Sequence, residues 1–562
     1  MPTKSPNAPA ASLHTVLDAI ATDEALPLQR RRNICSAIQA VSKLTGQPLG
    51  SLPSSPGFYR EKFARLHPEQ CGLSLSRLRN IKSDLLFALR RTGQVKQGHA
   101  YGDELSPEWA DLMKRAEGPQ RLHRYMSRFI HFCSANGISP ENVDDAASEK
   151  FRVYLHENSF VTNPAKAHQD ICRLWNRATK VIPGWPSQTL AVPRRKVTYT
   201  VTEQQYPKPL LREIDVFFDH KAGKNILDDE GPMRPMKART ISSRRYRLRQ
   251  IVSALVLSGY ELEALDSLAK LVDVEAAKTA LRFFLNRTGG KTTSQIFTLA
   301  IMLKDLGKNW LKVDERHLDQ LKAFCRKTNP GNKGLTEKNR DRLRQFDADN
   351  NIRLLLEFPR RQIEKTRRED KGRRRDAIAV QTALAVELLL MIPIRAENLI
   401  KIDITRHIQR SRTGASGIVH LVIPGEEVKN GEPLEFSLPK ETVELLDLYI
   451  RDFRPRLINT PVSWLFPGKS QRPKTRELFG DQISKHVYAA TGLRINLHLF
   501  RHIAAKLYLD RNPGGYEVCR RVLGHRSMDT TTGFYTGMEA AAAVKHFDEE
   551  ILKLRREVSR RT

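Results

Sequence analysis

Apolar residues in the first three hundred positions recur mainly with the period of an α-helix. Near the start, Ile34, Ile38 and Val41 are spaced by four and three residues, so they fall on one face of a helix. Comparable helical segments begin near residue 106 and again near residue 240, and a glycine follows each of them. We therefore predict three helical modules, one after another, in this part of the chain.

The pattern changes in the last two fifths of the chain. Apolar and polar residues alternate in 419–423 and again in 434–438, and the dipeptide Asn430-Gly431 between them is typical of a tight turn. These segments predict a β-hairpin. Before it, the apolar run 377–394 predicts a buried helix, and the densely charged stretch 360–376 predicts a loop.

Stretches rich in proline and glycine suggest where the domains meet. Several prolines in 191–209 favour an extended linker, and a second break lies at 327–334. The predicted organisation is a helical module in 1–100 that is a candidate for DNA binding, helical modules in 101–190 and 210–330 on either side of the linker 191–209, and an α+β domain in 335–562.

The composition is strongly basic. The 562 residues include 94 Lys plus Arg against 63 Asp plus Glu, which gives a formal net charge of +31. Such a surplus favours polyanionic partners, because each neutralised phosphate releases condensed counterions. Nucleic acid is therefore the first candidate partner.

Neither a membrane nor a metal is indicated. The run 377–394 is interrupted by Gln381, Glu387 and Pro393, and the N-terminus lacks the apolar core of a signal sequence. The six cysteines are scattered without a CxxC pair, so we predict neither a zinc site nor disulfides. We expect a cytoplasmic, nucleoid-associated protein that has no contact with membranes.

The stretch 497–535 groups residues suited to phosphate chemistry. Tyr535 supplies a nucleophile, while Arg501 and the histidines can hold and polarise a phosphate. His498 and Arg501 are three residues apart, so they share one face of a helix and can meet the same phosphate. If these groups converge, the chain can cut and rejoin DNA.

Five sequence elements follow one another in the last two fifths of the chain: an arginine after a buried helix, a lysine beside the hairpin turn, an HxxR motif, an LGH motif and a tyrosine. This order resembles the catalytic domain of the tyrosine recombinase (phage integrase) family. The residues are Arg395, Lys429, His498 with Arg501, His525, and Tyr535.

The resemblance implies a fold and a reaction. It implies mainly α N-terminal modules, core-binding-like (SAM-like) in 101–190 and 210–330, before an α+β catalytic domain with a small antiparallel sheet. Tyr535 would attack the scissile phosphate, form a 3′-phosphotyrosyl link and release a 5′ hydroxyl that Lys429 protonates. The two arginines and two histidines of the motifs would stabilise the transition state, and no metal, ATP or other cofactor is implied.

The resemblance also implies partners. The expected substrate is double-stranded DNA, bound by a homotetramer, with accessory DNA-bending proteins or partner recombinases as further candidates. The expected process is DNA integration, transposition of a mobile element or another site-specific recombination. Two alternatives remain open, a type IB topoisomerase-like relaxase and a non-catalytic DNA-binding regulator with the same fold.

Three details of the motifs bear on the site. Asn398 stands where the family often has an acidic residue, and Tyr535 lies ten residues after His525, about one more than in familiar members. His502 follows Arg501 directly, and adjacent helical positions face different ways, so we expect His502 to point away from the site. Tyr508 lies upstream of the LGH motif, and we expect it in the core.

Two groups of arginines are candidate DNA contacts. One group lies in the helix predicted to start near residue 240. The other lies in the predicted charged loop, for which a solvated loop and a segment that follows phosphates are equally good interpretations. The residues are Arg244, Arg245, Arg247, Arg249, Arg373, Arg374 and Arg375.

Overall fold

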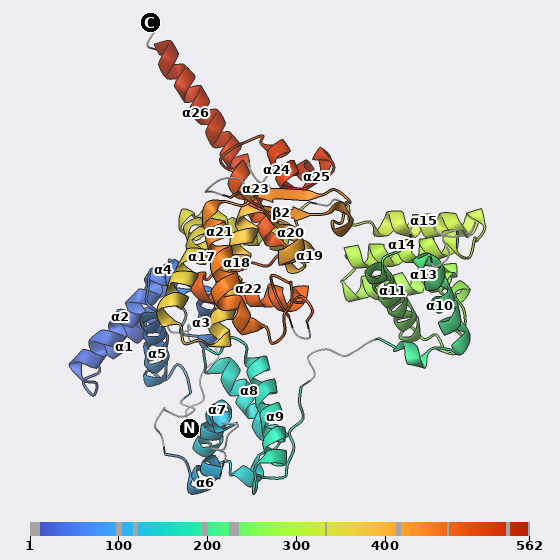
Figure 1. The fold of residues 1–562 in the computed structure, drawn as a ribbon. Coiled ribbons are helices and arrows are strands. Elements are labelled where there is room, and N and C mark those ends of the chain that lie inside the picture. Colours follow the sequence, from blue (N-terminus) through green and yellow to red (C-terminus); the bar gives the residue numbers. More distant parts are fainter. Residues whose placement is uncertain are drawn as a thin grey trace. The chain divides into compact units, whose positions relative to one another are not determined.

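The computed structural model describes residues 12–96, 104–115, 122–193, 200–223, 235–331, 334–411, 417–468, 471–535 and 540–559. These residues are mostly helical and contain one three-stranded antiparallel sheet (Figure 1). The predicted fold class, mainly α with an α+β C-terminal part, is confirmed. In the part of the chain that is described, no helix is long and apolar enough to cross a membrane.

The chain divides into two compact units, one made of 1–193 and 333–562 and the other of 194–332. Among the described residues there are four main hydrophobic cores, and the buried residues of each come from one continuous part of the chain. They span Leu13–Val95, Trp109–Leu190, Tyr206–Leu321 and Leu343–Ile503. The domain boundaries themselves stay a prediction.

Two helical groups precede the second unit. Amphipathic helices build both, and in the second group the Trp109 and Trp175 rings meet edge to face at 6.3 Å. The helices are α1 Leu13–Ala21, α2 Leu28–Thr45, α3 Pro56–Arg65, α4 Pro68–Cys71 and α5 Leu75–Arg91, then α6 Pro107–Arg115, α7 Leu122–Ala135, α8 Asp145–Glu157 and α9 Pro164–Val181.

The unit 194–332 is a helical bundle, green in Figure 1. Its first helix begins at Lys208, within the stretch predicted as a linker, because Leu210, Ile214 and Phe217 form an apolar face that is buried in the bundle. The helices are α10 Lys208–Ala222, α11 Ala238–Val256, α12 Leu268–Val272, α13 Val274–Arg287, α14 Ser294–Asn309 and α15 Glu315–Thr328.

The C-terminal part surrounds the long buried helix α18 (Arg374–Met391). Its other helices are α16 Glu337–Leu343, α17 Asp349–Glu369, α19 Ala396–Ile400, α20 Ile404–His407, α21 Lys440–Leu448, α22 Arg476–Thr491, α23 Leu499–Leu509, α24 Tyr516–Leu523, α25 Met528–Tyr535 and α26 Ala540–Ser559. Short 3₁₀ turns lie at Leu49–Ser51, Pro140–Asn142, Glu203–Gln205, Arg344–Asp347, Gly425–Glu427 and Arg454–Leu457, and a π-helical turn at Tyr449–Phe453.

The predicted hairpin is present as β2 (Val419–Ile423) and β3 (Leu434–Ser437), which pair antiparallel with Leu421 opposite Phe436. Alternate residues of β2 are buried, as the period of two predicts. A third strand, β1 (Ile408–Arg410), pairs with the other edge of β2 and was not predicted. The sheet therefore has the order β1-β2-β3.

The prediction of a charged loop over 360–376 is wrong for most of its length. Helix α17 continues through Pro359 to Glu369, although proline usually ends a helix. Leu355 and Phe358 bury one face of α17, and Arg361 is 2.7 Å from Glu357 on the exposed face. Burial and i,i+4 ion pairs together outweigh the hydrogen bond that Pro359 lacks.

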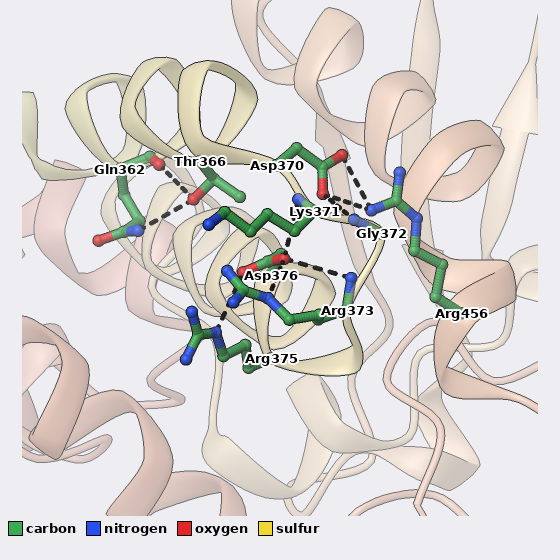
Figure 2. Close-up of polar contacts among 9 residues, drawn as sticks. All are labelled: Gln362, Thr366, Asp370, Lys371, Gly372, Arg373, Arg375, Asp376 and Arg456. Atoms are coloured by element: carbon green, nitrogen blue, oxygen red, sulfur yellow. Dashed lines mark hydrogen bonds and ion pairs between the residues drawn. The ribbon is translucent and has the colours of Figure 1, made fainter.

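Only a short turn separates α17 from α18, and several of its polar groups are paired (Figure 2). Asp370 accepts a hydrogen bond of 2.8 Å from Arg456. Asp376, in the first turn of α18, accepts from the backbone N–H of Lys371 at 3.3 Å and of Arg373 at 3.2 Å. The turn is therefore an ordered helix cap.

Candidate active site

Helix α23 supplies Arg501 and His502 to the site, and His498 directly precedes it. Leu499, Phe500 and Ile503 anchor it in the C-terminal core. This packing fixes the first turn, where His498 occupies the N-cap position and Arg501 follows three residues later. His498 is exposed, and partial desolvation together with the charges of nearby arginines lowers its pKa.

Arg501 is buried and bound to three groups at once. Its Nη1 donates to the Pro393 carbonyl at 2.7 Å, and its Nη2 donates to the Leu523 carbonyl at 2.6 Å and meets His525 Nε2 at 3.1 Å. Burial and the charge of Arg395 lower its pKa to about 10, so it stays protonated at neutral pH. Arg501 thus joins the end of α18 to the LGH motif.

Arg395 lies between α18 and α19 and is half-buried. Its Nη1 is buried and has no hydrogen-bond partner among the described residues. Burial lowers its pKa, and its charge acts on Arg501. A buried donor without a partner is costly in a folded protein, and a phosphate oxygen would satisfy it.

His525 follows Gly524, which has a φ of 58° and ends α24 in the left-handed conformation. Arginine can only donate, so His525 Nε2 accepts from Arg501 and Nδ1 carries the proton that it donates to Thr531 Oγ1 at 2.9 Å. Burial and the charges of Arg501 and Arg395 lower the pKa of His525 to about 4. The ring is therefore neutral at neutral pH and has a fixed tautomer.

The connection between β2 and β3 brings Lys429 to the same region. Asn430 Nδ2 donates to the Gly524 carbonyl at 3.2 Å, and Asn398 Nδ2 donates to the Glu427 carbonyl at 3.4 Å. Lys429 itself is exposed and makes no hydrogen bond or ion pair with any described residue. Asn398 therefore supports the loop of Lys429, in the position where the family often has an acidic residue.

Tyr535 ends α25, and its side chain is 1% exposed. Its hydroxyl lies 3.1 Å from His502 Nδ1. Burial raises the pKa of the phenol, and the charge of Arg501 opposes this shift. The hydroxyl is therefore protonated at neutral pH, within the electrostatic reach of Arg501.

The expectation that His502 points away from the site is wrong. His502 lies four residues after His498, so the two share a face of α23, and their ring centroids are 4.9 Å apart. The ring of Tyr535 packs on the same imidazole, with centroids 5.6 Å apart. Burial and the neighbouring imidazoles and Arg501 lower the pKa of His502 to about 3, so it is neutral.

Thr531 is a second residue that the motifs did not single out. It is fully buried and accepts the hydrogen bond of His525. Its position one turn before the tyrosine, on the helix that follows the LGH motif, is the signal that could have identified it. Thr531 keeps His525 in the tautomer that can accept from Arg501.

The four arginines predicted to contact DNA in the helical modules lie on α11. Arg244 is paired with Asp305, and Arg245 with Glu203 at 2.8 Å. Arg249 lies over the Tyr246 ring, 4.9 Å from its centroid. Burial and the charge of Arg244 lower the pKa of the fourth, Arg247.

The three arginines of the other group begin α18. Arg373 is bound to Asp376 at 3.3 Å, and Arg374 Nη1 donates to the Leu457 carbonyl at 3.2 Å. Arg375 is 70% exposed and lies 3.6 Å from Asp376 (Figure 2). Arg374 and Arg375 are both exposed, whereas Arg373 is half-buried.

The donor set of the site suits an anion. It combines two guanidinium groups with neutral imidazoles and hydroxyls, and none of the described residues assigned to it is a carboxylate. Within the described ranges, no group of three or more His, Cys, Asp or Glu side chains could hold a metal ion. The structure thus brings Arg395, Arg501, His525 and Tyr535 together, with His498 and the loop of Lys429 beside them.

No family model and no curated protein matches the chain. Similar solved structures include the XerH site-specific recombinase bound to its difH substrate in a pre-cleavage complex, with 15% identity, a TM-score of 0.37 and coverage of 62% of this chain and 99% of that one. A lambda integrase tetramer bound to a Holliday junction has 14% identity, a TM-score of 0.34 and coverage of 57% and 76%.

A third similar structure is the Tn1549 transposon integrase in complex with circular intermediate DNA. It has 16% identity, a TM-score of 0.33 and coverage of 56% of this chain and 94% of that one. These proteins are recombinases and integrases, the class that the sequence motifs resemble. With TM-scores below 0.5, the likeness assigns no activity to this chain.

Proposed function

We propose that this chain is a DNA tyrosine recombinase or integrase, which cleaves and rejoins DNA strands through a 3′-phosphotyrosyl intermediate. The convergence on Arg501 supports the proposal best. One buried guanidinium contacts His525 and the carbonyls of Pro393 and Leu523, and it acts on the phenol of Tyr535. Residues that are 142 positions apart, from Pro393 to Tyr535, are thereby gathered into one cationic site.

The scissile phosphate would bind between Arg395 and Arg501. The unsatisfied Nη1 of Arg395 would donate to one nonbridging oxygen. His498, exposed at the N-terminus of α23, would donate to the charge that develops in the transition state, and His525 would hold Arg501 in place through its Nε2. Each such donor is typically worth about 3 kcal/mol of transition-state stabilisation.

In the first step, the bond between Tyr535 Oη and phosphorus forms while the bond from phosphorus to the 5′ oxygen breaks. The phenol loses its proton, and Lys429 gives a proton to the leaving 5′ oxygen. Rejoining reverses these transfers with a 5′ hydroxyl as the nucleophile. The covalent link conserves the phosphoester energy, so the reaction consumes no ATP.

The proposal extends to the substrate, the oligomeric state and the cellular process. The motif resemblance and the net charge of +31 support double-stranded DNA as the substrate. We propose that a homotetramer acts on it, in the cytoplasm at the nucleoid, in DNA integration or transposition. The helical modules, with the arginines of α11, would grip the duplex.

A covalent-trapping experiment tests the chemistry. Sites are first selected from a pool of random duplexes by binding to the full chain, and a selected site is then built as a nicked suicide substrate. The expected result is a protease-sensitive protein–DNA adduct that forms without metal or ATP and disappears in Tyr535→Phe. Tyr508→Phe is the matched control, because Tyr508 is a partly buried tyrosine of α23 that packs against the same small apolar cluster as Tyr535 but makes no hydrogen bond through its hydroxyl to the described site residues, and it should form the adduct normally.

Other outcomes identify the alternatives. An adduct together with plasmid relaxation, but without recombinant products from two marked duplexes, would indicate a topoisomerase-like relaxase. Tight binding to a selected site without any adduct would indicate a DNA-binding regulator. Persistence of the adduct in Tyr535→Phe would overturn the assignment of the nucleophile.

A further inference from the structure

The phenol of Tyr535 needs a proton acceptor, and water is a poor candidate in this structure. An unperturbed phenol has a pKa near 10, so at neutral pH its proton must leave as the oxygen attacks. The side chain is 1% exposed, and burial raises the pKa of the phenol further. A group of the protein must therefore receive the proton.

His502 is the only hydrogen-bond partner of the Tyr535 hydroxyl among the described residues, at 3.1 Å. A buried hydroxyl donates its proton where an acceptor is within reach. The neutral imidazole offers that acceptor on Nδ1 when its proton is on Nε2. The contact thus has the distance and the direction that proton transfer requires.

The other groups of the site cannot take the proton. Arg395 and Arg501 are donors only. Both ring nitrogens of His525 are engaged, Nε2 by Arg501 and Nδ1 by Thr531. His498 packs against His502 and makes no hydrogen bond to Tyr535.

We propose that His502 is the general base that receives the phenolic proton. This inference rests on the proposed function. As Tyr535 Oη bonds to phosphorus, its proton moves to His502 Nδ1, and Lys429 Nζ gives a proton to the departing 5′ oxygen. In the rejoining step, Lys429 takes the proton of the 5′ hydroxyl, and His502 returns its proton to the departing phenolate, so both groups end as they began.

The electrostatics of the site are consistent with this role. The pKa of His502 is lowered to about 3, so its lone pair is free at every pH near neutrality. Burial is the main cause of the shift and nearby positive charge the second, and a bound phosphate brings negative charge that opposes this second cause. The phenolic oxygen also becomes strongly acidic as it bonds to phosphorus, so a weak base suffices late in the step.

The test uses His502→Asn in the full chain on the suicide substrate. Asparagine can place an acceptor oxygen near the position of Nδ1, but its amide does not take up a proton. We expect single-turnover cleavage at pH 7 to fall by roughly 100-fold or more, with DNA affinity and melting temperature unchanged. Cleavage within about threefold of wild type would show that His502 only positions the tyrosine, and would overturn the proposal.

A pH profile gives an independent readout. The wild-type cleavage rate should be flat from pH 6 to 8, because the imidazole stays neutral there. In His502→Asn the proton must go to hydroxide, so the rate should rise about tenfold per pH unit. Parallel profiles of the two proteins would contradict a base role. His502→Gln serves as the second variant if the asparagine variant fails to fold, and the same loss and slope are expected.

The matched control is His168→Gln. His168 is also a buried histidine, 5% exposed, and it is hydrogen-bonded through its ring to Ser148, far along the chain from the site residues. Its rate and pH profile should match those of the wild type. If the wild-type protein forms no adduct at all, the proposed function fails, whereas a wild-type adduct with an active His502→Asn overturns this inference alone.

Discussion

At the scale of single residues, the two arginines of the site differ in what they do for the fold. Arg501 satisfies the Pro393 and Leu523 carbonyls, whereas Arg395 keeps a buried Nη1 unsatisfied. The first arginine therefore supports the structure that surrounds it. The second has a cost in the free protein that a bound phosphate would remove.

Arg395→Met should therefore increase the stability of the protein and decrease its DNA-cleavage activity. Removing an unpaired buried donor is expected to raise the free energy of unfolding by about 1 kcal/mol, while DNA cleavage falls roughly 100- to 1,000-fold. Thermal unfolding and the adduct assay measure the two effects. Arg501→Met is the matched comparison and should destabilise the protein, because two buried carbonyls lose their donors. A destabilised Arg395→Met variant would contradict the assignment of Arg395 as unpaired.

The lowered pKa values of His502 and His525 predict that local stability depends on pH. Their unfolded pKa is near 6.5, and the folded pKa is about 4 for His525 and about 3 for His502. The unfolded chain thus binds more protons between pH 6.5 and 4, so stability must fall as the pH falls through that window, by at most about 1.4 kcal/mol per pH unit for each histidine.

Hydrogen exchange in α23 and α25, corrected for intrinsic rates, measures this loss of protection. His502→Asn should reduce the slope, because one of the titrating groups is gone. Protection that stays constant or increases on acidification would contradict the burial of these imidazoles in their neutral form.

At the scale of elements, the LGH turn positions His525 through Gly524. A Cβ built on Gly524 lies 3.0 Å from Leu434 Cδ2, so β3 packs directly against the turn. The φ of 58° adds a second reason for glycine at this position. The backbone of the turn and the sheet that carries the Lys429 loop therefore fit together closely.

Gly524→Ala should reduce both stability and cleavage. The left-handed conformation costs an alanine about 1 kcal/mol, and the contact with Leu434 would displace His525 from Arg501. Gly372→Ala is the control, since Gly372 has a similar φ of 68° and its Cβ would meet nothing within 4 Å. We expect both variants to lose melting temperature, Gly524→Ala more than Gly372→Ala, and a loss of adduct for Gly524→Ala alone. Equal activity of the two variants would speak against a positioning role of the turn.

Sequence patterns predicted the elements with strong periodicity. The buried run in 377–394 and the alternation in β2 and β3 correspond to observed elements, because burial of one or both faces imposes those patterns. The charged segment after Pro359 is helical although its charges predict a loop. The charges do not reveal that Leu355 and Phe358, on the opposite face of α17, are buried in the core. Local composition does not contain that tertiary contact.

The site was predicted unevenly for a similar reason. The motif order names residues that the structure gathers, such as Arg501, His525 and Tyr535. It does not name Thr531 or His502, whose contacts depend on where α25 packs against α23. Helical spacing places His502 on the face of His498, but only the packing of Tyr535 shows that this face belongs to the site.

At the scale of the whole molecule, each of the four main cores is made from one continuous stretch of chain. The buried core residues of the unit 194–332 lie between Tyr206 and Leu321, and Val201 and Phe324 of the same unit pack against them. Such a core needs no residue from elsewhere in the chain. The bundle α10–α15 therefore has what a separately folding domain requires.

A fragment of residues 200–331 should fold alone. We expect a helical circular dichroism spectrum and a single cooperative thermal transition, because its whole core is retained. A fragment of residues 200–312 is the matched control. It lacks α15 and with it Leu321, which belongs to the core, so its transition should be broad or lost. A non-cooperative melt of the longer fragment would contradict the inference that this bundle folds separately.

Because the donor of Arg395 is unsatisfied, the melting temperature of the protein should show whether a ligand occupies the site beside it. A ligand that accepts a hydrogen bond from Nη1 of Arg395 binds only the folded state, so its binding adds to the free energy of unfolding. A shift in melting temperature thus registers an occupied site before any strand is cut. Simple oxyanions and short oligonucleotides can be ranked in this way while the target sequence is still being sought.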